Sequence, residues 1–142
     1  MLNKKVLLDI QMSMVNANDI EDYDMSVIGN YRKKDNNYIV EYLENAMDNT
    51  KTVITFGEQV EILRQGCYNS NILMELNKRC QSIYSTPFGE ANVSVTASHI
   101  DCNLNDFGGD VKLKYAIDID GQLSSAYSMS IKIKEMSKEG NK

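Results

Sequence analysis

The sequence lacks several features that mark common classes of protein. No apolar run approaches the roughly 20 residues that a membrane-spanning helix requires, so we expect no membrane partner. The three cysteines, Cys67, Cys80 and Cys102, are far apart and form no Cys-x-x-Cys pair, which argues against a zinc site and against a disulfide framework. We therefore expect free thiols, no metal and no other cofactor.

Residue sets that would indicate catalysis are also missing. His99 is the single histidine, whereas a catalytic triad or a histidine metal site needs several partners. Ser85 and Thr86 precede the single proline rather than occupying a Gly-x-Ser-x-Gly turn, and Gly108 and Gly109 precede a strand-like run rather than a helix. These absences predict a protein that is not an enzyme, with an enzyme of an unfamiliar type as the remaining alternative.

Positive charge is in the minority. The 142 residues include 15 Lys and Arg against 20 Asp and Glu, which gives a net charge of −5 at pH 7. Because nucleic-acid binders depend on clustered Lys and Arg to neutralise phosphates, we expect no nucleic-acid partner. The N-terminal segment MLNKKVLLDIQMSM is interrupted by Asp9 and Gln11 and leads to no small-residue cleavage site, so we interpret it as a strand rather than a signal peptide. The expected location is cytoplasmic.

Alternation of apolar and polar residues dominates the chain, and this pattern is typical of β-strands with one buried face. Near the C-terminus, for example, Val111, Leu113 and Tyr115 share one face, while Lys112 and Lys114 lie on the other. Runs of this kind occupy residues 5–14, 27–34, 36–44, 51–57, 59–66, 71–77, 80–85, 91–99, 110–120 and 125–135.

The separators between these runs are short and turn-like, which favours hairpins over parallel crossovers. A meander with one apolar face per strand can bury that face, and remove its exposed edges, by closing on itself. We therefore predict an all-β fold, a closed antiparallel meander barrel of about 8–10 strands. The prediction is a single domain over residues 1–136 with a flexible tail over residues 137–142.

Two segments also fit a helix. Residues 39–47 and 72–80 each place their apolar side chains on one helical face. Enrichment in Tyr, Ile and Val between Tyr38 and Tyr42 favours a strand for the first segment. Because consecutive strands tend to pair and the neighbouring runs are strands, we prefer strand for both segments and keep helix as the alternative.

Register constrains the turn around Asp120 and Gly121. A slip of one residue turns the apolar face of a strand outward, so Tyr115 and Tyr127 must remain on the same side. A two-residue turn would set Tyr115 opposite Ala126 instead. The alternation therefore predicts a three-residue loop that contains a type I turn, with Gly121 in the left-handed conformation.

The same parity argument places a row of mostly polar side chains inside one end of the barrel. The predicted inward row is Glu44, Thr52, Arg64, Ile72 and Tyr84. The turn over residues 86–89 suits type I geometry, because Pro87 is its second residue and a glycine its fourth. By parity this turn lies at the same mouth as residues 45–51, residues 65–71, the Asp120 turn and the acidic segment 19–24.

A set of short motifs extends over nearly the whole chain. They are EYLE (41–44), KT (51–52), LRQG (63–66), YSTPFGEANVSVT (84–96), and GDVKLKYAIDIDG (109–121) followed by SMSIKIKE (128–135). In their order and spacing the chain resembles the YwiB-like family of small bacterial proteins of unknown function. The resemblance implies a calycin-like, and in that sense lipocalin-like, closed barrel whose better-known relatives hold a ligand inside. It brings no catalytic residues to this chain.

Arg64 and Glu44 are the strongest candidates for a binding site. An inward guanidinium can bind a carboxylate or phosphate through paired hydrogen bonds, and Tyr42, Thr52 and Tyr84 would add hydroxyls around it. The alternative is a structural pair that closes the barrel end. We predict non-enzymatic binding of a small amphipathic or anionic ligand at this mouth, with its head at Arg64. The alternative function is a solid-cored interaction or scaffold barrel without a small-molecule ligand.

Two further features lie in the C-terminal half. By alternation, His99 falls on the inner face with Val93, Val95 and Ala97, where an ordinary capped histidine is expected. An outer basic strip interleaved with serines comprises Lys112, Lys114, Lys132 and Lys134. This strip is either a solvated surface or a docking site for an acidic partner, and a homodimer is a further possibility.

Overall fold

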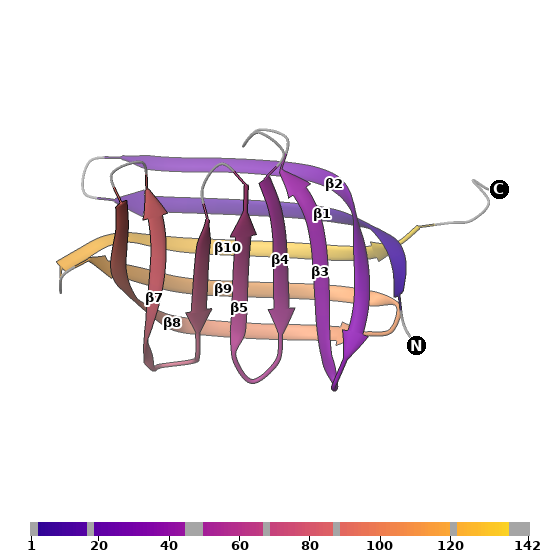
Figure 1. Cartoon of the computed structure of the whole chain (residues 1–142). Coiled ribbons are helices and arrows are strands. Elements are labelled where there is room, and N and C mark those ends of the chain that lie inside the picture. Colours follow the sequence, from indigo (N-terminus) through magenta and orange to yellow (C-terminus); the bar gives the residue numbers. More distant parts are fainter. Residues whose placement is uncertain are drawn as a thin grey trace.

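The computed structural model of the protein describes residues 3–16, 19–44, 50–66, 69–86, 89–119 and 122–136, without the side chains of residues 84–86, 90, 122 and 123. These residues form ten β-strands (Figure 1). The strands are β1 (Asn3–Asn16), β2 (Ile20–Lys34), β3 (Asn37–Glu44), β4 (Thr50–Phe56), β5 (Val60–Gln65), β6 (Ser70–Met74), β7 (Arg79–Thr86), β8 (Gly89–Asn105), β9 (Gly108–Ile119) and β10 (Gln122–Glu135).

The strands form a closed barrel in which each strand is antiparallel to its neighbours in the sequence. The ring is completed by β1, which pairs with β2 on one side and with β10 on the other. The seam between β1 and β10 is long, and extends from the pair Val6–Glu135 to the pair Asn16–Ser125. The predicted closed antiparallel meander barrel is therefore confirmed, with ten strands.

The helical alternatives are wrong for the residues that the structure describes. Residues 39–44 belong to β3, which pairs with both β2 and β4, and residues 72–74 belong to β6. Partners on both sides satisfy the backbone of β3, and its Tyr, Ile and Val side chains suit a pleated surface. Residues 45–47 lie outside the described ranges. Within those ranges, no segment forms a helix of the length and apolarity that crossing a bilayer requires.

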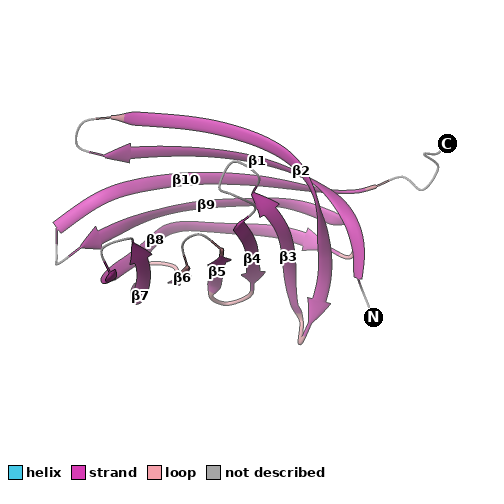
Figure 2. Ribbon diagram, turned by 45° about the horizontal axis from the view of Figure 1, so that its top comes forward, coloured by secondary structure: helices cyan, strands magenta, loops and turns pink. Residues whose placement is uncertain are grey.

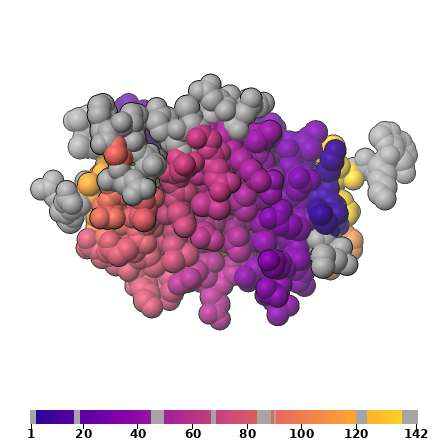
Figure 3. Space-filling view, in the orientation of Figure 1, coloured from indigo at the N-terminus to yellow at the C-terminus, as the bar shows by residue number. Residues whose placement is uncertain are grey.

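Two walls of strands cross each other in the barrel (Figures 1 and 2). β1, β9, β10 and the long parts of β2 and β8 form one wall, and β3 to β7 form the other, whose side chains make a continuous surface in Figure 3. β2 passes between the walls, because residues 20–29 pair only with β1 whereas residues 30–34 also pair with β3. At the bend, a Cβ on Gly29 would lie 2.6 Å from the carbonyl oxygen of Glu41, so only glycine fits there.

One end of the barrel is packed shut, and we call it the closed end. Tyr31 stacks on Tyr38 with ring centroids 5.2 Å apart, and its hydroxyl donates a hydrogen bond to the carbonyl oxygen of Asn105 at 2.8 Å. The hydroxyl of Tyr38 donates to Asp106 Oδ1 at 2.7 Å. These bonds fix the β8–β9 turn against the barrel. The fully buried core beneath it includes Val6, Leu8, Val40, Ile54, Val60, Ile62, Met74 and Val111.

The β9–β10 hairpin keeps the predicted parity by a different route. Tyr115 lies opposite Tyr127, and Leu113 lies opposite Met129, as the alternation requires. The three-residue loop is wrong, however, because Ile119 pairs directly with Gln122. A β-bulge between Leu123 and Ser125 supplies the extra residue that returns the apolar side chains to the interior. Residues 120 and 121, and with them the conformation of Gly121, lie outside the described residues.

The acidic segment 19–24 is largely strand rather than turn. β2 begins at Ile20, and Asp22, Tyr23 and Asp24 pair with Ser13, Met12 and Gln11 of β1. Alternation of Tyr23, Met25 and Val27 with Asp22, Asp24 and Ser26 would have revealed this extension. The density of acidic residues made the segment look like a loop.

Candidate functional site

Inward side chains become more exposed toward the end opposite the closed end, and we call this end the mouth. Along β1, Ile10 is buried, whereas the next inward side chains, Met12 and Met14, are partly exposed. Along β2, Tyr31 is fully buried and Tyr23 is 48% exposed. Met12 packs against the core, as do Met25 and Tyr127, so the mouth has an apolar and aromatic lining.

A row of paired residues crosses β3 to β7 just below the mouth. Paired in order along this row are Tyr42, Thr52, Arg64, Ser70 and Tyr84. The row therefore differs from the predicted one at two places. Glu44 pairs with Thr50 and lies one inward position nearer the mouth, and Ser70 rather than Ile72 is opposite Arg64.

Glu44 and Arg64 form a buried ion pair with poor hydrogen-bond geometry. Arg64 Nε lies 3.7 Å from Glu44 Oε2, and the two side chains are only 14% and 4% exposed. The hydroxyl of Tyr42 donates a long hydrogen bond of 3.4 Å to Glu44 Oε1. Among the described residues, Glu44 Oε2, Thr52 Oγ1 and Arg64 Nε are buried without a hydrogen-bond partner. The site thus holds an acceptor, a donor and a hydroxyl whose capacity to hydrogen-bond is not used by these residues.

The electrostatics show that several tyrosines face this ion pair. Burial lowers the pKa of the Arg64 guanidinium, but Glu44 and the phenols of Tyr42 and Tyr115 outweigh it, so the pKa is raised overall. Burial, reinforced by the charge of Glu44, raises the pKa of the Tyr42 and Tyr23 phenols. Both phenols therefore remain protonated at neutral pH and can donate hydrogen bonds.

The raised pKa of Tyr42 predicts a loss of stability in alkali. An unfolded tyrosine loses its proton near pH 10, whereas folded Tyr42 retains it, so stability is complete below about pH 10 and falls as pH rises above it. Wild-type protein should lose up to about 1.4 kcal/mol more per pH unit there than Tyr42→Phe. Urea unfolding at about pH 9 and about pH 11 measures the difference, and equal losses in the two proteins would contradict the assignment.

The structure brings most of the predicted site residues together. Arg64, Glu44, Tyr42 and Thr52 all face the same part of the interior. Tyr84 occupies its predicted place in the backbone of the row, but its side chain lies outside the described part. Pro87 also lies outside it, between Thr86 and Gly89, which pair with each other.

Sequence reasoning missed the tyrosines that line the mouth. Tyr23 was assigned to the acidic segment, although the charge of Glu44 acts on its phenol. Tyr127 stacks on Tyr115 with ring centroids 5.0 Å apart, and the phenol of Tyr127 also acts on Tyr23. The signal was available in the alternation, which places all three inward.

The prediction for His99 is wrong. A β-bulge between Ala97 and His99 inserts one residue, so His99 pairs with Lys114 on the outer face and is exposed. Elsewhere in the described part of the chain, no group of His, Cys, Asp or Glu side chains could hold a metal ion. Cys80 and Cys102 are free thiols there, whereas Cys67 lies outside it.

Comparison with known proteins identifies similar sequences and folds but no activity. The profile of a domain of unknown function, DUF1934, matches residues 8–131. The crystal structure of the ywiB protein from Bacillus subtilis is similar, with a TM-score of 0.83 and 18% sequence identity over 94% of this chain and 93% of that chain. No curated protein matches the chain in sequence. At this level of identity, the structural similarity establishes the fold alone.

Proposed function

The chain belongs to the DUF1934 family of YwiB-like, calycin-like barrels, whose function is unknown, and we propose from its own side chains that it binds a small amphipathic ligand at the mouth. The apolar body of the ligand contacts Met12, Met25 and the neighbouring tyrosines. Its polar head contacts Arg64 and Glu44. No chemical step is part of this proposal.

The unused hydrogen-bonding capacity of the ion pair is the observation that carries the proposal. Buried polar atoms are nearly always hydrogen-bonded, and leaving one unpaired costs about 1–3 kcal/mol. Arg64 Nε and Glu44 Oε2 are 3.7 Å apart, so a single ligand atom that both donates and accepts can contact both. A hydroxyl has this capacity.

The charge of Glu44 distinguishes between the amphipathic and the anionic ligand. Glu44 already neutralises the guanidinium of Arg64, so a carboxylate head would approach a second negative charge in a poorly solvated site. We therefore favour a neutral head group that forms hydrogen bonds. An anion would bind with comparable strength only if Glu44 moved away.

Two probes with the same apolar chain test this proposal. In protein labelled with carbon-13 at the methionine methyl groups, 1-decanol should shift the NMR signals of Met12, Met14 and Met25 saturably, and decanoate should do so more weakly. Met136, which is exposed near the C-terminus, is the internal control. Absence of saturable shifts with both probes would contradict ligand binding, and tighter binding of decanoate would contradict the neutral head. Native mass spectrometry of purified protein would show a small molecule that co-purifies.

Thr52→Val should separate binding from stability. Thr52 Oγ1 has no hydrogen-bond partner among the described residues, so the isosteric change removes no bond from the fold and should leave the Tm unchanged or slightly higher. If the ligand head reaches this hydroxyl, the affinity for 1-decanol should fall about tenfold. Thr55→Val, in the same strand but on the opposite face, is the matched control. Unchanged affinity for 1-decanol in Thr52→Val would show that the ligand does not contact this hydroxyl.

The packed interior favours one competing function. The inward side chains below the row, including Val40, Ile54 and Ile62, are fully buried, so the closed half of the barrel is solid. A barrel that is solid throughout would act as an interaction scaffold without a small-molecule ligand. The methionine NMR experiment distinguishes a scaffold from a ligand-binding barrel, because a scaffold gives no saturable shift of the methionine signals at the mouth.

A further inference from the structure

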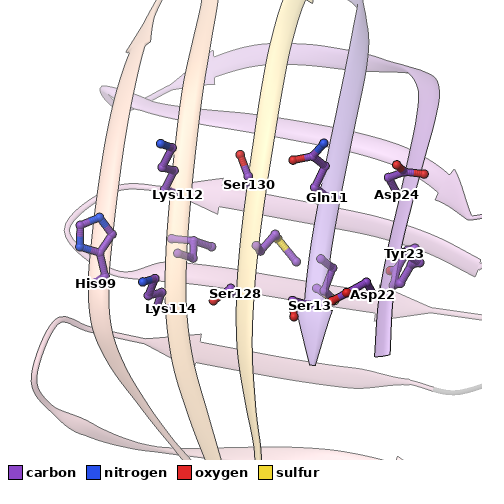
Figure 4. Close-up of a pocket in the computed structure, with 13 residues that line it drawn as sticks. Gln11, Ser13, Asp22, Tyr23, Asp24, His99, Lys112, Lys114, Ser128 and Ser130 are labelled. Atoms are coloured by element: carbon purple, nitrogen blue, oxygen red, sulfur yellow. The ribbon is translucent and has the colours of Figure 1, made fainter. Parts of the chain in front are cut away.

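The outer face of the long-strand wall carries two ordered rows of polar side chains. Register aligns His99, Lys114, Ser128, Ser13 and Asp22 across β8, β9, β10, β1 and β2. The adjacent row is Asp101, Lys112, Ser130, Gln11 and Asp24. Figure 4 shows the lysines on one side, the aspartates on the other and the serines between them. We call this surface the two-row face.

The two-row face is hollowed along its middle. Short side chains on β10 and β1 form the floor, and the longer side chains of Lys112 and Lys114 form one flank. A shallow depression of about 700 Å³ lies over these strands. The flanking lysines and aspartates are exposed, so their charges are available to a partner.

The four flanking charges have no ion-pair partner among the described residues. Lys112 and Lys114 on β9 are separated from Asp22 and Asp24 on β2 by three strand spacings, about 14 Å. This distance prevents pairing within one chain. Farther along the same wall, by contrast, Lys134 Nζ lies 3.7 Å from Asp9 Oδ2.

We propose that the two-row face is a docking surface for a second copy of this chain. A two-fold axis parallel to the strands, above the line between β10 and β1, superimposes the basic flank of one copy on the acidic flank of the other. Lys114 then faces Asp22 of the partner subunit, and Lys112 faces Asp24 of the partner subunit. Ser128 and Ser13 meet in the floor. Each contact occurs twice, as an isologous dimer requires.

Charge complementarity favours a second copy over other occupants. An acidic protein would pair with the lysines but would be repelled by Asp22 and Asp24 on the other flank. A small zwitterion cannot span about 14 Å between the flanks. The chain itself presents both signs at the required separation and in the required register. Because the pairs are exposed at the edges of the contact, we expect a salt-sensitive dimer.

The charged flanks of the two-row face are separate from the ligand site, although Met12 and Tyr23 line both the depression and the mouth. Lys112 and Lys114 point outward from β9, whereas the intervening Leu113 is buried in the core. Failure of ligand binding at the mouth would therefore leave the dimer untouched. Failure of the dimer would likewise leave the mouth unaffected.

Sedimentation equilibrium of the full chain at low salt tests the proposal through charge reversal. Wild-type protein should dimerise, and both Lys112→Glu/Lys114→Glu and Asp22→Lys/Asp24→Lys should weaken self-association about 100-fold, because each places like charges together. An equimolar mixture of the two variants should form a heterodimer, since both flanks of one copy are then acidic and both flanks of the other are basic. This recovery is specific to the proposed pairing.

A matched control changes the net charge equally at a different surface. Lys5→Glu/Lys34→Glu reverses two exposed lysines outside the two-row face and should dimerise like the wild type. A monomeric wild type at high micromolar concentration in low salt would overturn the proposal. Equal disruption by the control, or a mixture of variants that stays monomeric, would also overturn it.

Discussion

Replacing Arg64 with methionine is expected to lower the free energy of unfolding by about 3–5 kcal/mol, and adding Glu44→Gln in the same chain should restore most of it. Removal of the guanidinium leaves the Glu44 carboxylate, 4% exposed, without its neutralising partner. Burying an unpaired charge is far more costly than burying a matched pair. The double variant removes both charges, so the remaining cost is confined to packing and the Tyr42 hydrogen bond.

A second ion pair in the same barrel provides the control. Arg32 Nη1 lies 3.0 Å from Glu41 Oε1, which is closer than the Arg64–Glu44 distance, but these side chains are 37% and 25% exposed. Because water can solvate the Glu41 carboxylate, and Lys51 Nζ lies 3.3 Å from its Oε2, Arg32→Met should cost only about 0–1 kcal/mol. Urea unfolding of the wild type, Arg64→Met, Glu44→Gln, the double variant and Arg32→Met completes the comparison. If Arg64→Met and Glu44→Gln each unfold like the wild type, the ion pair has no structural role.

Gly109→Ala should destabilise the closed end by about 2–6 kcal/mol, which combines the strain of an unusual backbone conformation with overpacking. Gly109 has a φ of +142°, a conformation that L side chains rarely adopt. A Cβ at this position would also collide with the carbonyl oxygen of Asn103 on β8. Gly108, with a φ of +125°, meets the carbonyl oxygen of Ile133 in the same way. Both glycines therefore permit close approach of neighbouring backbones.

Gly89→Ala separates the two contributions. Gly89 has a φ of +119°, but a Cβ there would meet no atom of the described residues within 4 Å. The substitution should therefore cost only the backbone strain, about 1–3 kcal/mol, and less than Gly109→Ala. Thermal unfolding of both variants at the same pH gives the comparison. Equal Tm values for Gly89→Ala and Gly109→Ala would show that the collision is relieved without cost.

Alternation predicted the barrel because it records one physical requirement, the burial of one face of every strand. The ten predicted runs correspond to the ten strands, and the inward positions of Glu44, Thr52 and Arg64 followed from parity alone. The pairing of Thr52 with Arg64 also followed, but the partners on either side of these two residues did not. Alternation does not fix which residues pair, because register also depends on the geometry of the turns. Ser70 rather than Ile72 therefore lies opposite Arg64.

Bulges account for one error of orientation and one error of loop type. An inserted residue reverses the parity of the strand that follows it, yet it leaves little trace in a pattern of apolar residues. The bulge before His99 turns that side chain outward. The bulge after Leu123 adds the residue that we had expected in a three-residue loop. Gly108 and Gly109 were recognised only as an unlikely phosphate loop. Their role depends on backbones brought close by the completed fold.

The β1–β10 seam has a consequence for synthesis of the protein. Every other seam joins strands that are adjacent in the sequence, so the sheet can grow hairpin by hairpin as the chain emerges from the ribosome. Until the last strand has emerged, the nascent sheet keeps two open edges that can pair with other chains. Residues 125–135 of β10 therefore close the barrel last. A chain that terminates before them keeps both edges of its sheet exposed to pairing with other chains.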